Sequence, residues 1–446
     1  MRVPVASFDR ERKALEVAEP FRIYGQVRKV VGLIIESSGP PARIGDICWI
    51  SNSTTSKIEK ENLIRAEVVG FRENSVLLMP IGEMTGVQAG NLVINTGECL
   101  KVPVGEALLG RVLDGLGEAI DKKGNLDTRD VQPVFNVPPH VLQRRFIRTP
   151  LTLGVRAIDG LLTCGEGQRV GIFSGSGVGK STLLAMIARN SSADVNVIAL
   201  VGERGREVRE FIENDLGEEG LKKSVVVVAT SEQPALVRIK AAFTATAIAE
   251  WFRENGKKVV LMMDSITRFA MAQREVGLAI GEPPSTKGYT PSVFALLPRL
   301  LERAGNSHKG SITAFYTILV EGDDTNEPIA DATRAILDGH IVLDRKLSNR
   351  GHYPAIDPLN SLSRVMPSIV SEEHQRAANR FRELFAAYRD VEDLLMIGAY
   401  KPGTNPVADC AIERWEKINA FLRQNKTERV ADFQNTLANL MGITDA

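Results

Sequence analysis

The chain has 446 residues, of which 43% are hydrophobic and 25% are charged, and its formal net charge at pH 7 is zero. This composition is ordinary for a folded globular protein, and the length exceeds one usual domain, so we expect about three structural units. A net charge of zero provides no basic footprint for nucleic acid, and no nucleic acid partner is expected.

Cysteine spacing and hydropathy restrict the cellular setting. Cys48, Cys99, Cys164 and Cys410 are scattered without metal-ligand spacing, which favours reduced thiols over disulfides or a zinc site. The N-terminal region lacks the apolar core of a signal peptide, and no uncharged apolar stretch of about 18 residues occurs. We therefore expect a cytoplasmic protein whose contact with a membrane is peripheral.

Residues 1–18 and residues 19–95 differ in the pattern of their charged and apolar residues. Residues 1–18 carry charges of both signs around Phe8, Leu15 and Val17, and a helix this short is marginal alone. A frayed terminus and a helix that docks on a partner protein both stay open. Residues 19–95 contain short β-rich runs separated by Gly, Asn and Pro, which predict a small closed β-barrel. Basic and aromatic residues are not interleaved in these runs, which favours a structural or oligomerising role.

The remainder of the chain predicts an α/β domain followed by helices. The proline-rich residues 131–145 (VQPVFNVPPHVLQRR) predict an extended connector between the barrel and the next domain. Across residues 96–370, apolar runs such as VNVIALV, SVVVVAT and KVVLMM alternate with helical segments. Near-continuous apolar strands are typical of a parallel sheet covered on both faces. Residues 371–446 have helical periodicity and predict a helical C-terminal domain.

Residues 169–190 read RVGIFSGSGVGKSTLLAMIARN and carry the strongest functional signal. An apolar run, a glycine-rich loop and a helical segment predict a strand, a phosphate-binding loop and a helix. Glycines let consecutive backbone N–H groups face a phosphate at the positive end of the helix. The expected nucleotide-binding residues in the loop are Ser174, Gly175, Ser176, Gly177, Val178, Gly179, Lys180, Ser181 and Thr182.

Two residues of this loop have roles of their own. Lys180 is expected to reach the terminal phosphates, and the Ser181 hydroxyl is expected to bind Mg²⁺. The sequence matches the pattern GxxxxGK[ST] except at Ser174, which stands where the pattern has its first glycine. A flexible Gly/Ser linker is the alternative, but linkers are not normally framed by a buried strand and a long amphipathic helix. The loop therefore predicts nucleotide binding.

Two carboxylates follow strand candidates, and ligands gather at the carboxyl ends of strands in such sheets. Asp264 ends the VVLMM run, and a carboxylate at the end of an apolar strand is typical of one that holds Mg²⁺ through water. The less favoured alternative is an N-cap of the next helix, and the two roles are compatible. Glu203 follows IALV within GERGRE. It either polarises the attacking water or belongs to a solvated charge cluster, and the residues alone leave both interpretations open.

A family resemblance covers about residues 20 to 440. The segments SGSGVGKST, VGERGREVREF, VVLMMDSITRFA, PRLLERAG, EGDD, HYPAID and SLSRV occur in this order. As a set they resemble the catalytic subunits of rotary F- and V-type ATPases and, more closely, the flagellar and injectisome ATPases of type III protein export. The resemblance implies an α/β, P-loop (RecA-like) parallel-sheet core, with an N-terminal small β-barrel and a C-terminal helical domain. It also implies that ATP is the substrate and Mg²⁺ the cofactor.

The resemblance assigns catalytic roles. Glu203 is expected to activate water, with Lys180 and Arg204 in the same site. Arg364 of the SLSRV segment is expected to enter the neighbouring subunit's site as an arginine finger, a structural salt bridge being the alternative. Tyr353 is expected to flank the adenine, although an aromatic residue at a turn also suits a core position.

The resemblance also implies partners. Because the chain carries both the site and the finger, a homohexamer is expected. The further expected partners are a regulatory or stator-like protein at the N-terminal arm, a central stalk-like protein, export substrates and chaperones, and an export gate at the inner face of the cytoplasmic membrane. The GAYKPGTNP segment at Gly398 favours a flagellar system, with an injectisome as the alternative.

Two other functions are disfavoured by the sequence. A regulatory subunit that binds nucleotide but hydrolyses little is disfavoured by the presence of Lys180, Glu203 and Arg364. A hexameric RNA translocase is disfavoured because residues 20–93 have no basic and aromatic surface.

Overall fold

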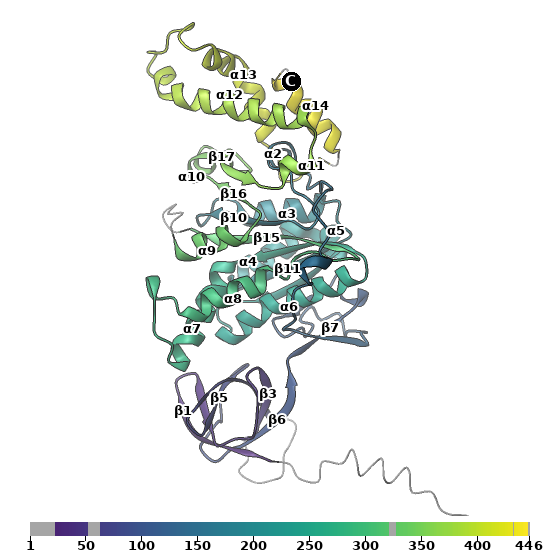
Figure 1. The fold of residues 1–446 in the computed structure, drawn as a ribbon, viewed down its shortest axis with the longest axis vertical. Helices are drawn as coiled ribbons and strands as arrows, with labels where there is room; N and C mark the ends of the chain where they lie inside the picture. Colours follow the sequence, from purple (N-terminus) through teal and green to yellow (C-terminus); the bar gives the residue numbers. More distant parts are fainter. Residues whose placement is uncertain (1–22, 52–62, 321–326, 431, 445–446) are drawn as a thin grey trace, which may run out of the picture. The chain divides into compact units, whose positions relative to one another are not determined.

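The computed structural model describes residues 23–51, 63–320, 327–430 and 432–444. The chain divides into two compact units, residues 1–99 and residues 100–446, and each is described separately (Figure 1). The arm expected at residues 1–18 lies outside the described residues. Within the described parts, no helix combines the length and the apolar character needed to cross a membrane. All four cysteines are unpaired.

The first unit is a closed antiparallel barrel with the strand order β1-β2-β5-β4-β3-β6. Ile35, Ile50 and Val68 are completely buried inside it, because successive side chains of a strand point to opposite faces. The barrel confirms the predicted fold, and its last strand extends to Cys99. The strands are β1 (Gly25–Val31), β2 (Ile34–Ser37), β3 (Asp46–Ser51), β4 (Leu63–Arg72), β5 (Ser75–Pro80) and β6 (Leu92–Cys99).

The second unit is built on a large sheet with the order β17-β16-β10-β15-β13-β11-β12-β8, and β14 pairs beside β15. The pairs from β16 to β8 are parallel, whereas β17 and β14 run antiparallel to their neighbours. The mainly parallel sheet confirms the predicted core. Its strands are β8 (Val112–Asp114), β10 (Arg169–Ser174), β11 (Val195–Val201), β12 (Ser224–Ala229), β13 (Lys258–Asp264), β14 (Gly305–Asn306), β15 (Ser311–Leu319), β16 (Gly339–Leu343) and β17 (Ile356–Ser363).

Helices cover both faces of this sheet, which is why every residue of β11 and β12 is buried. One face packs against α3 and the segment from α4 to α5, and the other packs against α6, α7 and α9, with α8 on α7 (Figure 1). These helices are α3 (Lys180–Asn190), α4 (Gly205–Glu210), the π-helix η4 (Phe211–Leu216), α5 (Gly217–Lys222), α6 (Ala235–Glu254), α7 (Ile266–Ile280), α8 (Pro291–Leu301) and α9 (Pro328–Ile336). Short single-turn elements are η2 (Glu106–Leu108), η3 (Val141–Gln143), η5 (Thr286–Gly288), α10 (Arg345–Asn349) and α11 (Met366–Ile369).

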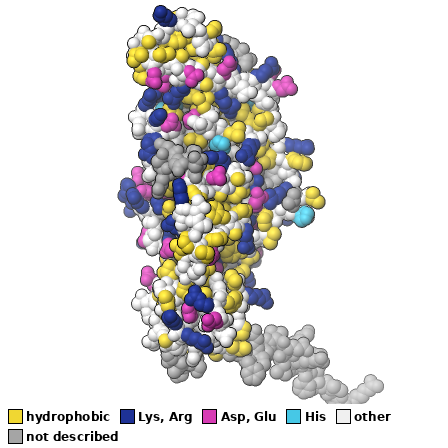
Figure 2. Space-filling model, turned by 60° about the vertical axis from the view of Figure 1, so that its left-hand side comes forward, with side chains coloured by type: hydrophobic (Ala, Val, Ile, Leu, Met, Phe, Trp, Pro, Cys, Tyr) yellow, Lys and Arg dark blue, Asp and Glu magenta, His cyan; other side chains and the backbone are white. Residues whose placement is uncertain are grey.

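The C-terminal region is helical, as predicted. It consists of α12 (Glu372–Met396), α13 (Pro406–Leu422) and α14 (Phe433–Thr444), which pack on α2 (Arg156–Leu161). Most of their buried apolar residues belong to the same hydrophobic cluster as α3 and one face of the sheet. On the molecular face drawn in Figure 2, cationic and anionic side chains are interspersed, in keeping with the net charge of zero.

The connector predicted at residues 131–145 is wrong, because this segment lies inside the second unit. It begins within β9 (Asp130–Pro133), which pairs with β7 (Lys101–Val104). The Phe135 ring packs on the Phe243 ring of α6, with 4.5 Å between the ring centroids. Proline content indicates an extended backbone, but an extended backbone also suits an edge strand packed on the domain core.

Candidate active site

The phosphate-binding loop joins β10 to α3. Gly177 and Gly179 adopt φ angles of 78° and 97°, which residues with a Cβ rarely adopt, so the turn requires glycine at both positions. Gly179 is the N-cap of α3 and, as a glycine, has no side chain with which to cap this end. The first N–H groups of α3 lack partners within the helix and suit phosphate oxygens at the positive end of the helix dipole.

The loop tolerates a serine where its sequence pattern has glycine. Among the described residues, Ser174 is not one of those with a positive φ, so its backbone does not need glycine. Its side chain is buried, and its Oγ makes no hydrogen bond within the described part of the chain. Val178 is also buried, whereas Ser176 and Ser181 are exposed and Thr182 is half-buried.

Lys180 lies between two carboxylates that come from neighbouring strands. Its Nζ donates a hydrogen bond to Asp264 Oδ1 and lies 3.4 Å from Glu203 Oε1. Asp264 ends β13 and Glu203 follows β11, and these strands are parallel neighbours whose carboxyl ends meet at one edge of the sheet. The structure therefore brings together three of the predicted catalytic and metal-binding residues.

Burial controls the charges of this cluster. The side chains of Lys180, Glu203 and Asp264 are only 11%, 16% and 3% exposed. Burial alone would lower the pKa of Lys180, but the charges of Asp264 and Glu203 outweigh it and raise that pKa. Burial raises the pKa of Glu203, with Lys180 opposing the rise and Asp264 adding to it. Thr317 orients Asp264 by donating to its Oδ1 at 2.8 Å.

Asp264 does not cap the helix that follows it. Ser265 is the N-cap of α7, and its side chain accepts a hydrogen bond from Arg268 N at 3.3 Å. Mg²⁺ prefers oxygen ligands, and the Asp264 carboxylate and the Ser181 hydroxyl, next to Lys180, form a donor set of that kind. The residues present therefore fit a magnesium ion.

Arg268 is a candidate site residue that sequence reasoning missed. A Cβ added to Gly202 would lie 2.8 Å from Arg268 Cβ, so the arginine packs directly on the residue before Glu203. Arg268 Nε is buried without a hydrogen bond, and Nη1 contacts only Met271 Sδ, at 4.0 Å, in the described chain. A guanidinium without a carboxylate partner beside a candidate base suits an anionic ligand. Its signal in the sequence is its place four residues after Asp264.

The structure places Tyr353 beside the loop and leaves Arg204 outside the cluster. A Cβ added to Gly179 would lie 3.5 Å from the Tyr353 ring. Tyr353 is 47% exposed, and its hydroxyl lies 3.0 Å from Ser348 Oγ. Arg204 is the N-cap residue of α4, and its side chain is 78% exposed and pairs with Glu207 at 3.5 Å.

Arg364 lies at the opposite end of the sheet from the phosphate loop. It follows β17, whose antiparallel pairing sets Ser363 opposite Gly339 at the start of β16. The Arg364 side chain is exposed, and its backbone N–H donates to Asp338 O at 3.0 Å. Asp338 N donates in turn to Arg169 O, at the start of β10. The loop begins five residues along β10, about 17 Å away at the rise of a strand. Arg364 therefore does not reach Lys180 of its own chain.

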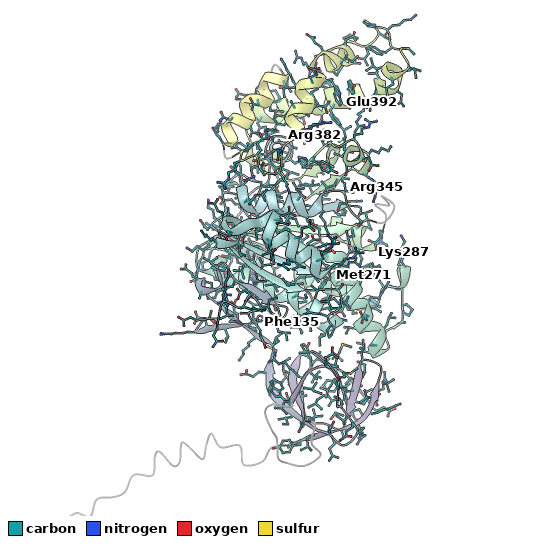
Figure 3. The ribbon with its side chains drawn as sticks, turned by 180° about the vertical axis from the view of Figure 1, so that it is seen from behind. Phe135, Met271, Lys287, Arg345, Arg382 and Glu392 are labelled. Atoms are coloured by element: carbon teal, nitrogen blue, oxygen red, sulfur yellow. The ribbon has the colours of Figure 1, made fainter. Side chains whose placement is uncertain are left out.

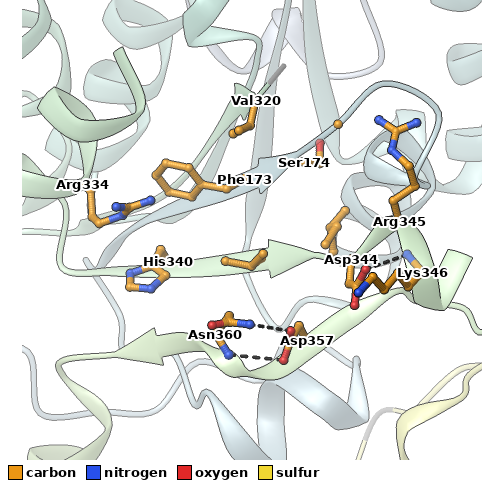
Figure 4. Close-up of a pocket in the computed structure, with 13 residues that line it drawn as sticks. Phe173, Ser174, Val320, Arg334, His340, Asp344, Arg345, Lys346, Asp357 and Asn360 are labelled. Atoms are coloured by element: carbon orange, nitrogen blue, oxygen red, sulfur yellow. Dashed lines mark hydrogen bonds between the residues drawn. The ribbon is translucent and has the colours of Figure 1, made fainter. Parts of the chain in front are cut away.

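Two cavities flank the loop. One of about 520 Å³ lies beside Ser174 and Gly175 at the ends of β10, β16 and β17 (Figure 4). Within it, the rings of His340 and Phe173 are nearly perpendicular, with 6.0 Å between their centroids.

The second cavity, of about 500 Å³, is lined by Ser176, Arg268 and three further cationic residues, Arg274, Lys287 and Arg345. Met271, which also lines it, lies with Lys287 and Arg345 on one side of this unit (Figure 3). Both volumes are in the range of small-molecule sites.

Three models of known protein domains match this chain. The model of the "ATP synthase alpha/beta family, nucleotide-binding domain" matches residues 154–363, and the model of the beta-barrel domain of the same family matches residues 27–97. The "T3SS EscN ATPase C-terminal domain" matches residues 370–442. A flagellum-specific ATP synthase of Bacillus subtilis (strain 168) is 56% identical over 432 residues, covering 96% of this chain and 97% of that protein. The chain belongs to the ATP synthase alpha/beta family.

Other members of the family are similar over the same length. A type 3 secretion system ATPase of Xanthomonas euvesicatoria is 51% identical over 439 residues, which cover 98% of this chain and 97% of that protein. The solved structure of the assembled ATPase EscN from the enteropathogenic E. coli type III secretion system has a TM-score of 0.88 and 48% identity, covering 94% of this chain and 100% of the solved chain. EscN in complex with its central stalk EscO has a TM-score of 0.86. As a member of this family, the protein is an ATP hydrolase.

Proposed function

We propose that this ATPase works as a homohexameric ring that couples Mg-dependent ATP hydrolysis to type III protein export in a flagellar system, the alternative being an injectisome. The observation that carries the ring is the separation of Arg364 from the cluster of Lys180, Glu203 and Asp264. One protomer holds a site and a finger that do not meet. A ring of identical copies supplies each site with the finger of its neighbour.

Each residue of the site then has a defined task. Lys180 exchanges its carboxylate contacts for the terminal phosphates of ATP, and Glu203 accepts a proton from the attacking water. Ser181 and Asp264 would hold Mg²⁺, which when bound offsets the negative charge of the phosphate oxygens.

The remaining residues act around the nucleotide. Tyr353, beside Gly179, flanks the adenine. Arg204 would have to leave its exposed pair with Glu207 to act next to Glu203. Arg364 from the neighbouring protomer stabilises the charge that develops on the transferred phosphoryl group.

The setting follows from the relatives. Because EscN was solved with a central stalk, we propose a stalk-like partner for this ring too. Residues 1–18 would bind a regulatory or stator-like protein, and the ring would act on export substrates and chaperones in the cytoplasm, at the inner face of the membrane beside the export gate. Loss of flagellar filaments, rather than of effector secretion, in cells carrying Lys180→Ala would support the flagellar setting.

Mixing two inactive variants tests the ring. Lys180→Ala removes the phosphate contact but keeps the finger, and Arg364→Ala does the reverse. Each alone should be inactive, while their mixture should recover part of the ATPase activity at interfaces that combine an intact site with an intact finger. Arg429→Ala, which removes an exposed arginine paired with Glu219, is the control and should remain active alone. Absence of recovery would contradict a finger acting between protomers.

A further inference from the structure

The backbone that carries Arg364 is held by a buried hydrogen-bonded junction. Gln168 Nε2 donates to Ser363 Oγ at 3.1 Å and to Asp338 O at 3.3 Å. Asp338 O also accepts from Arg364 N at 3.0 Å. Ser363 Oγ donates in turn to Thr163 O at 2.9 Å. The Gln168 amide therefore bonds directly to Ser363, the residue before Arg364, and shares the acceptor Asp338 O with the backbone N–H of Arg364.

This junction leaves little room for movement. Gln168 is completely buried, and its Oε1 accepts a hydrogen bond from Gly165 N at 2.9 Å, so both ends of the amide are held. A Cβ added to Gly339 would lie 2.6 Å from Leu362 O and 3.2 Å from Gln168 Nε2, so only glycine fits between the two strands here. A close-packed, fully bonded junction has few alternative arrangements.

The junction is also joined to the strand that leads to the phosphate loop. The Asp338 carboxylate accepts hydrogen bonds from Arg169 N and Nε, both at 3.0 Å, and from Arg169 Nη2 at 3.1 Å. Arg169 is the first residue of β10. Two roles for Gln168 therefore need to be separated, one towards Arg364 and one towards the loop of its own protomer.

We propose that Gln168 is a positioning residue for the arginine finger, and that it holds, through Ser363 and Asp338, the backbone from which Arg364 projects into the neighbouring site. The Arg364 side chain is exposed, so within the protomer its position is decided by the backbone from which it starts. This inference rests on the proposed function, because it requires a finger that acts between protomers.

Replacing the amide without changing its volume much, as in Gln168→Met, removes both donated bonds. Misplacing a catalytic group by 1 Å costs about 100-fold in rate, so we expect kcat to fall by about 10- to 100-fold. The dissociation constant for ATP should change little, because the phosphate loop of the same protomer keeps its contacts. A fall in ATP affinity as large as the fall in kcat would overturn the proposal.

Mixing again separates the two roles. Gln168→Met protomers have an intact site and a displaced finger, whereas Lys180→Ala protomers have an intact finger and no working site. Their mixture should recover activity if Gln168 acts through Arg364. No recovery, in a preparation where Arg364→Ala with Lys180→Ala does recover, would overturn the role of Gln168 while leaving the ring in place. No recovery in either mixture would instead contradict the proposed function.

Two further variants guard against a general loss of structure. Ser363→Ala removes the acceptor of the hydrogen bond from Gln168. If Gln168 and Ser363 act through this bond, the double variant Gln168→Met/Ser363→Ala should lose no more activity than the more impaired single variant. Asn196→Leu is the matched control, because Asn196 is also a completely buried amide, bonded to Ala188 O at 2.8 Å, but lies on β11. It should lower the melting temperature without lowering kcat. An equal fall of kcat in this control would assign the effect of Gln168→Met to destabilisation.

Discussion

Glu203 accepts a proton only when its carboxyl group is ionised, and its burial opposes ionisation. Because burial raises its pKa above the usual 4.5, the carboxylate becomes protonated at a higher pH than an exposed glutamate would. As the pH falls through this raised pKa, the free enzyme loses its base. The sign of the effect is a loss of activity on the acid side.

Glu203→Gln should therefore bind ATP but lose most of its hydrolysis, since the amide keeps the shape and removes the base. In the wild-type enzyme, kcat/KM should fall on an acid limb that lies above pH 4.5, the usual pKa of the group, and this limb should be missing from the residual activity of the variant. The profile of kcat/KM against pH, with ATP binding measured in parallel, tests this. An acid limb that persists in Glu203→Gln would belong to another group.

Arg268 carries a charge without a carboxylate partner in the described chain. Arg268 is half-buried, and its Nε is buried without a hydrogen bond. A partly desolvated cation without a partner is unfavourable until an anion binds, so Arg268→Met should leave the melting temperature unchanged or raised while kcat/KM for ATP falls. The conservative variant Arg268→Lys restores the charge and should recover part of the activity. A lower melting temperature with normal turnover would make Arg268 a structural residue.

At the scale of elements, one buried ion pair joins three parts of the second unit. Arg303, just after α8, donates from Nε and Nη2 to the Glu250 carboxylate of α6, at 2.8 and 2.6 Å. Its Nη1 donates at 2.7 Å to Val134 O, in the segment mistaken for a connector. Both side chains are only 1% exposed. The pair therefore fixes α6, α8 and the chain after β9 together.

Arg303→Met should lower the free energy of unfolding by roughly 3–5 kcal/mol, because it leaves the Glu250 charge buried and uncompensated. The double variant Glu250→Leu/Arg303→Met should lose less, since no charge remains unpaired. Urea unfolding followed by circular dichroism measures both. Arg429→Ala, which breaks an exposed pair with Glu219, should have no measurable effect. A double variant less stable than the single one would refute this account.

At the scale of the whole molecule, activity should depend on assembly. If Arg364 completes a neighbour's site, an isolated protomer is inactive, and specific activity should rise with protein concentration as rings form. Steady-state ATPase assays over several orders of magnitude of dilution, with sizes followed by light scattering, check this. Arg364→Ala should stay inactive throughout. Constant specific activity down to concentrations at which only protomers remain would exclude a shared site.

Much of the fold, together with the phosphate loop and the two carboxylates of the site, could be predicted because these features follow from local sequence patterns. The alternating and continuous apolar runs specified the barrel, the parallel strands and the terminal helices. The glycine-rich loop specified a phosphate site, and the rule that ligands gather at carboxyl strand ends singled out Asp264 and Glu203. Each of these signals lies within a few residues of sequence, where period and turn chemistry act.

Tertiary structure alone decided how distant segments meet. The sequence does not report that Lys180 bridges Glu203 and Asp264, or that Arg268 packs on Gly202. Nor does it report that residues 131–145 belong to the second unit. These contacts depend on the order in which strands far apart in the chain pair, and each apolar strand has several possible neighbours. The antiparallel pairing of β17 with β16 is the clearest case, because the direction of β17 sets Arg364 at the end of the sheet away from its own phosphate loop.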